Sequence, residues 1–144
     1  MASFSVYVSI RLQGDELIPN QLTELLGCCP TRAWAKGDLK DVSNRQILAK
    51  SGLWRLSSEK TACTLDAQVS ALYKQLDTRS VKTLIDVPGV TDAKLDVLVL
   101  KQATNLNSEV SVSLNRESIT RIKELGIEMM MTFGCLDYSD ARYL

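Results

Sequence analysis

The sequence contains no histidine. This absence removes the usual general base of enzymes, the serine and cysteine triads that depend on an imidazole, and the commonest metal ligand. The seven glycines never form a phosphate-binding loop, and no Cys-x-x-Cys pair or calcium-loop pattern occurs. We therefore predict a protein that is not an enzyme and has no catalytic residues, no metal site and no cofactor.

An excess of charge of one sign and long apolar runs are also missing. Seventeen basic and seventeen acidic residues cancel, so no overall positive potential favours a nucleic-acid backbone as partner. No stretch approaches the roughly eighteen consecutive apolar residues of a membrane span. The N-terminal residues lack the pattern of a secretory signal. We expect a cytoplasmic protein that binds neither nucleic acid nor membrane.

The four cysteines do not indicate a disulfide framework. Cys28 and Cys29 are neighbours, whereas Cys63 and Cys135 are isolated. Cys28 and Cys29 are predicted to follow the end of a helix, where the negative end of the helix dipole raises the pKa of a thiol. We expect most of the cysteines to be buried as small hydrophobic residues rather than to act as nucleophiles.

Hydrophobic periodicity predicts a single α+β domain over residues 1–144. The 45% hydrophobic and 24% charged fractions are those of a chain that folds. Alternating apolar residues predict strands, and apolar residues at a spacing of three or four predict helices. The predicted strands are 4–12, 30–35, 52–57, 92–100, 110–114 and 127–135, the predicted helices are 19–26, 66–76, 81–87 and 115–126, and the tail 136–144 has no pattern.

Helix ends carry their own signals. Pro19 suits a first helical position, and Gly27 suits the left-handed residue that ends a helix. Asp66 is the expected N-cap of the second helix, and Asn115 that of the last one. The last helix is expected to bury Ile119, Ile122 and Leu125.

Two parts of the chain resemble each other. Residues 4–27 and 110–127 both run from a strand through a polar turn into a helix that ends near Glu-Leu and a glycine. This predicts two strand–helix–strand units that share one sheet. The predicted fold is a two-layer α+β sandwich with a mainly antiparallel sheet and helices on one face, with the ferredoxin-like arrangement as the candidate topology.

The segment 36–51 is polar and predicts a long loop, flanked by the only two tryptophans. Loops of this length are often functional, and aromatic and arginine side chains are frequent anchors of interfaces. The alternative is that both tryptophans pack as core and that Lys36 to Asp38 form a simple turn. The candidate partner-binding residues are Arg32, Trp34, Lys36, Asp38 and Trp54.

A combination of motifs resembles a bacterial family of domains of unknown function. It comprises Leu-Thr-Glu-Leu-Leu-Gly at 22–27, Pro-Thr-Arg-Ala-Trp-Ala-Lys-Gly-Asp at 30–38, Gly-Leu-Trp-Arg-Leu at 52–56 and Glu-Leu-Gly-Ile at 124–127. The likeness covers about Phe4 to Phe133 and implies a small α+β domain with no catalytic residues to carry over. The genes of family members look similar to genes that lie beside those of secreted bacterial toxins. The resemblance therefore implies an immunity role for some members.

These observations favour a non-catalytic protein, most concretely an immunity protein that neutralises a cognate bacterial toxin by binding it. One alternative is a small-ligand-binding or regulatory domain with a pocket between sheet and helices. Another is a structural homodimer that associates through a sheet edge or face.

Overall fold

The computed structural model describes residues 4–58, 64–102 and 109–136. One five-stranded sheet and one small hairpin form its β-structure, and the helices pack against the sheet. The elements are β1 (Phe4–Gly14), α1 (Pro19–Leu26), β2 (Arg32–Trp34), β3 (Leu39–Val42), β4 (Arg45–Leu48), β5 (Gly52–Ser57), α2 (Leu65–Gln75), the 3₁₀ turn η1 (Leu84–Asp86), β6 (Asp92–Gln102), α3 (Arg116–Leu125) and β7 (Glu128–Leu136).

The sheet has the strand order β2-β5-β1-β6-β7. All neighbours are antiparallel except β6 and β7, which are parallel. In β1–α1–β2 the two strands run in the same direction with β5 between them, and in β5–α2–β6 they run in the same direction with β1 between them. This interleaving is the ferredoxin-like arrangement. The predicted α+β class, with a mainly antiparallel sheet, is confirmed.

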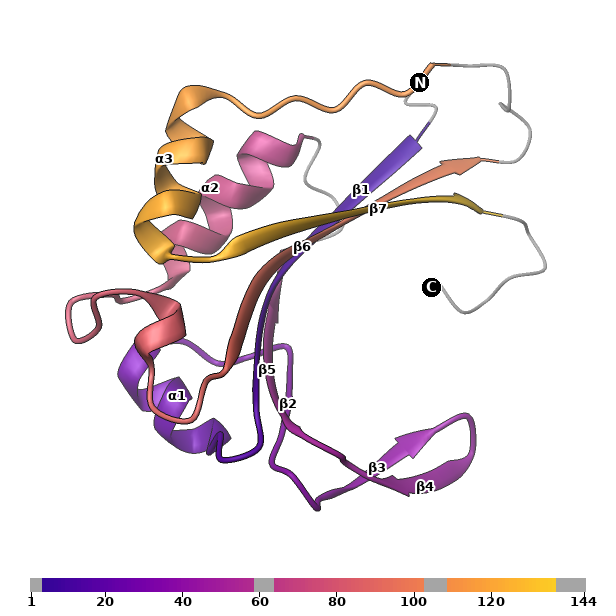
Figure 1. Ribbon diagram of the computed structural model, residues 1–144. Coiled ribbons are helices and arrows are strands. Elements are labelled where there is room, and N and C mark those ends of the chain that lie inside the picture. The colour runs from indigo at the N-terminus through magenta and orange to yellow at the C-terminus, as the bar shows by residue number, and fades with distance from the viewer. Residues whose placement is uncertain (1–3, 59–63, 103–108, 137–144) are drawn as a thin grey trace.

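The two strand–helix–strand units are not the predicted pair. The second unit is β5–α2–β6, and residues 110–127 belong to an addition in which α3 connects β6 to β7. Residues 110–114 form no strand, although Val110, Val112 and Leu114 pack on the core. In Figure 1 this extended segment runs along the upper end of the molecule into α3. Its alternation reflects one buried side, because an alternating pattern records burial rather than strand pairing.

The helix ends follow the predictions in part. Pro19 opens α1 and Gly27 closes it with φ 67°, and the Asn115 side chain accepts a hydrogen bond from the backbone N–H of Ser118 at 2.8 Å. The N-cap of α2, however, is Thr64 and not Asp66. Threonine and aspartate both suit this position, so the sequence does not distinguish between neighbouring candidates.

Asp66 has a different role, because it joins two helices. Its carboxylate accepts a hydrogen bond from the backbone N–H of Asn115 at 2.9 Å and another from the Ser118 hydroxyl at 2.6 Å. This fixes the start of α3 against the first turn of α2. Ser118 is consequently buried, and Ile119, which was predicted to be inside, is 54% exposed. The predicted helix over 81–87 is only the short turn η1.

The core lies between the helices and one face of the sheet. Figure 1 shows α1, α2 and α3 on the same side of the sheet, and the hairpin β3–β4 extending from its lower end on the other side. Strand residues that face the helices are almost completely buried, as Ile10, Leu12, Trp54, Leu95 and Val97 illustrate. No helix in the described ranges is long and apolar enough to cross a membrane. Among the described elements no helix lies on the opposite face of the sheet, which we call the uncovered face (Figure 1).

Candidate partner-binding surface

The segment 36–51 is a β-hairpin and not the loop that was predicted. Strands β3 and β4 pair from Leu39 with Leu48 to Val42 with Arg45. Ser43 and Asn44 connect them, both with positive φ, 50° and 65°. Two such residues between paired strands form the type I′ turn that matches the twist of a hairpin. The prediction failed because the strands carry many polar residues and pack little apolar surface against the core.

The hairpin exposes an unusual amount of apolar surface. Leu39 and Leu48 lie opposite each other and are 65% and 61% exposed. Val42 and Ile47 lie on the other side of the hairpin and are 44% and 40% exposed. Clustered apolar side chains in solvent are typical of interaction sites rather than of ordinary surface.

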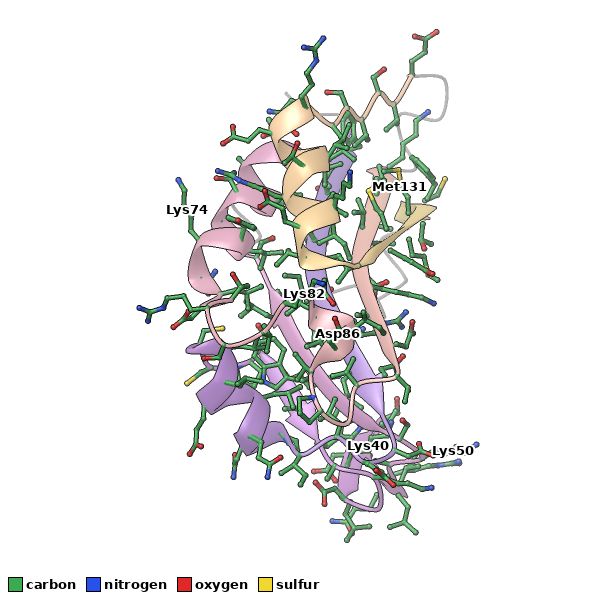
Figure 2. All side chains as sticks on the ribbon, turned by 60° about the vertical axis from the view of Figure 1, so that its left-hand side comes forward. Lys40, Lys50, Lys74, Lys82, Asp86 and Met131 are labelled. Atoms are coloured by element: carbon green, nitrogen blue, oxygen red, sulfur yellow. The ribbon has the colours of Figure 1, made fainter. Side chains whose placement is uncertain are left out.

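Trp34 lies where the hairpin meets the sheet. Its indole N–H donates a hydrogen bond to the backbone carbonyl of Ser51 at 3.0 Å. The Lys40 ammonium lies 4.5 Å from the centre of its ring, and the Arg32 guanidinium lies 6.0 Å from it. Cations at such distances are attracted to the indole face. In Figure 2, Lys40 and Lys50 lie together at this end of the molecule, far from Lys74 on α2.

Lys36 and Asp38 belong to a turn at the start of the hairpin. Gly37 has φ 88°, and the Asp38 N–H donates to the carbonyl of Ala35 at 3.1 Å, as expected for a turn that needs glycine. The Asp38 carboxylate accepts a hydrogen bond from the Ala35 N–H at 2.8 Å. Lys36 reaches Asp15 at 3.4 Å, and both side chains are exposed.

Trp54 is not part of this surface. It is completely buried, and its indole N–H donates a hydrogen bond to the Thr23 hydroxyl on α1 at 3.2 Å. Of the predicted partner-binding residues, Arg32, Trp34 and Asp38 line one hollow together with β3, and Lys36 is in the adjoining turn. The alternative interpretation, in which both tryptophans pack as core, therefore holds for Trp54, whereas Trp34 is only half-buried.

A row of cations crosses the uncovered sheet face. Arg32, Arg55, Arg11 and Lys94 lie directly opposite one another on β2, β5, β1 and β6. Asp96 accompanies them, with its Oδ2 3.2 Å from Arg11 Nε and 3.6 Å from an Arg55 terminal nitrogen. Burial lowers the pKa of the Arg55 guanidinium; Asp96 opposes this shift, and Arg11 and Arg32 add to it.

Sequence reasoning missed Arg11, Arg55 and Asp96. Each occupies a polar position in an alternating strand, and such positions are normally solvated. The signal that unites them is the register between strands, which places Arg11 opposite Arg55 and Asp96 opposite Ser9. The order of the strands has to be known before this signal appears.

The described cysteines show no reactive site. Cys28 is half-buried, whereas Cys29 and Cys135 are exposed, so the expectation that most are buried was wrong for these two. Burial raises the pKa of the Cys28 thiol, and the neighbouring Cys29 raises it further, so the predicted direction holds for Cys28 but burial, not the helix dipole, is the cause. Among the described residues no group of three or more cysteine and carboxylate side chains is placed to hold a metal ion. Cys63 and the tail beyond Leu136 lie outside the described residues.

Together, the interleaved strands and the uncovered, cation-bearing face define an α+β domain with a ferredoxin-like core. The family described as "Domain of unknown function (DUF4279)" matches residues 4–134, and the chain belongs to this family. No curated protein and no solved structure gives a significant match to this chain.

Proposed function

We propose that this protein is a non-catalytic binding protein, and that the hairpin β3–β4 and the sheet face beside it hold a protein partner. The observation that carries this proposal is the exposure of Leu39 and Leu48, which lie opposite each other on the hairpin and are 65% and 61% exposed. No other described part of the chain covers these two side chains. Burying these side chains against a partner removes apolar surface from water, which is the main driving force of association.

The charges near the hairpin favour an acidic partner. Residues 32–55 contain six basic side chains (Arg32, Lys36, Lys40, Arg45, Lys50 and Arg55) and two acidic ones (Asp38 and Asp41), although the chain as a whole is neutral. An apolar centre with arginine and a half-buried tryptophan beside it has the composition of a protein interface. Complementary charge accelerates the encounter and selects the partner.

In its concrete form, the proposal is that the partner is a cognate bacterial toxin and that this protein is its immunity protein. The supporting observation is the family resemblance, which points to genes beside secreted toxins. Neutralisation by occlusion requires only a stable scaffold and a complementary surface. A helix-packed sheet with one uncovered face and a projecting hairpin is such a scaffold and offers a surface for a partner.

The test is to measure, by calorimetry on the purified proteins, binding to the product of any toxin gene that lies beside the gene for this protein. We expect the double variant Leu39→Asp/Leu48→Asp to raise the Kd by about a hundredfold or more. The variant removes two apolar anchors and places two negative charges on the surface. Ile119→Asp is the matched control, since Ile119 is 54% exposed on α3. It should bind like the wild type.

Unchanged binding by the double hairpin variant would overturn the assignment of the surface. Sedimentation of the protein with and without the toxin separates the remaining interpretations. A 1:1 complex supports the proposal, whereas a stable homodimer that ignores the toxin would favour a structural dimer. The exposed Phe133 on the edge strand β7, at 62%, is the position to mutate in that case.

A further inference from the structure

The uncovered sheet face is hollowed beside the row of cations. The hollow lies over β5, β1, β6 and β7, and its lining includes Tyr7, Arg11, Arg55, Asp96, Leu98 and Met130. Charged groups thus line part of it and apolar side chains another part. We call it the open-face cleft.

The two arginines of the open-face cleft have donors without acceptors. Within the described residues, the buried Nε of Arg55 makes no hydrogen bond, and the buried Nε of Arg11 faces Asp96 Oδ2 at 3.2 Å without the geometry of a hydrogen bond. Both guanidinium groups approach the same oxygen of Asp96, at 3.2 and 3.6 Å. A guanidinium carries five N–H donors, and one shared carboxylate oxygen does not satisfy the buried Nε donors of both arginines. Buried unsatisfied donors are rare in folded proteins and call for a missing acceptor.

The positive charge of the open-face cleft is also incompletely neutralised. Arg55 lies directly between Arg32 and Arg11 in the register, and like charges in directly opposite positions are destabilising. Asp96 compensates one of these charges, and Lys94 has its own partner in Asp92 at 3.5 Å. An anion in the open-face cleft would relieve the repulsion and satisfy the unused donors at once.

We infer that the open-face cleft binds a carboxylate group, supplied by an Asp or Glu side chain, or the C-terminus, of the protein partner. This inference rests on the proposed function. A carboxylate carries two acceptor oxygens that match a guanidinium edge in a bidentate pair. Leu98 and Met130 offer apolar contacts to the methylene groups or side chain beside it.

The surrounding carboxylates argue against a nucleic acid as the ligand. Asp96 lies inside the open-face cleft and Asp92 beside the cation row, where they would repel a chain of phosphates. A backbone of phosphates is held by many unpaired cations along an extended path. Here the excess positive charge is confined to a short row, which suits one anionic group.

The first experiment tests the chemistry of the open-face cleft without the partner. The probe is N-acetyl-leucine, which presents one carboxylate beside an apolar side chain, and its neutral control is N-acetyl-leucinamide. We expect the acid to shift the Nε–Hε NMR signals of Arg11 and Arg55 saturably, with a Kd on the order of millimolar, and the amide to leave them in place. Equal shifts with both compounds, or tighter binding of a single-stranded oligonucleotide, would overturn the inference.

The second experiment tests the source of the carboxylate. Arg55→Met should raise the Kd for the toxin by about thirtyfold, because a desolvated charge pair is lost. Arg79→Met is the control, since Arg79 is 90% exposed and pairs with Asp77. If the acid binds but Arg55→Met leaves toxin binding unchanged, the partner does not supply the carboxylate. The proposed function is then judged separately by the hairpin variants.

Discussion

The two faces of the sheet differ although they are built from neighbouring residues of the same strands. Ile10 and Trp54 are completely buried under the helices, whereas the next residues, Arg11 and Arg55, form part of the cation row. The same contrast separates Leu95 from Asp96. Side chains alternate across a strand, so one face can be optimised for packing while the other carries charges that lower stability. The helix-covered face specifies the fold, and the uncovered face is free to carry function.

The largest effect should come from the tryptophan on the helix-covered face. Trp54→Ala is expected to lower the free energy of unfolding by about 3–5 kcal/mol, because it removes a fully buried ring and leaves a cavity. It also removes the donor of the hydrogen bond to Thr23. Chemical denaturation followed by circular dichroism gives the value.

Trp34→Ala is the matched comparison, because Trp34 lies on the neighbouring strand but on the uncovered face. We expect a loss of about 1 kcal/mol there, mainly from the hydrogen bond to Ser51. Equal losses at the two positions would mean that the hairpin end packs as tightly as the core. The contrast between the faces would then be wrong.

A smaller effect of opposite sign is expected in the cation row. Arg55→Met should raise the free energy of unfolding by about 0.5 kcal/mol, because it removes a cation held between Arg32 and Arg11 and keeps an aliphatic side chain in place. Arg11 retains its contact with Asp96. Arg55→Lys, which preserves the charge, should show no such gain, and added salt should reduce the difference.

A clear loss of stability in Arg55→Met would show that the arginine contributes to the fold. The cation row would then need no functional explanation. A gain in stability together with weaker partner binding in Arg55→Met would show that Arg55 lowers the stability of the free protein and contributes to recognition of the partner.

The sequence predicted the helix-covered face far better than the uncovered one. Phe4 to Leu12 alternate strictly, and Asn115 and Gly126 are chemically suited to the helix ends that they form, so local patterns sufficed there. The ferredoxin-like order was proposed, but from the wrong pair of units, because the segment 110–114 alternates without pairing. Burial patterns reveal one apolar side and not the neighbour that covers it.

The candidate surface was predicted only where local chemistry marks it. Arg32, Trp34, Lys36 and Asp38 lie at the base of the hairpin, close to where their motif suggested, but the same reasoning included Trp54, which is core. Tryptophan suits an interface and an interior equally well, so residue type does not separate the two. The Arg11–Arg55–Asp96 cluster depends on the register between strands. Arg11 and Asp96, which are 85 positions apart in the sequence, meet only through this register, so no local sequence pattern marks the cluster.

The smallest effect on stability should come from the hairpin, and it separates the two faces most cleanly. Leu39→Asp/Leu48→Asp is expected to change the free energy of unfolding by no more than about 0.5 kcal/mol, because these side chains are already in solvent and lose no core contact. Thermal and chemical unfolding measure this change in the same variant that is used for toxin binding. A large destabilisation would show that the leucines support the hairpin itself. An unchanged stability with abolished binding would place their contribution in the complex, where the exposed apolar surface is finally buried.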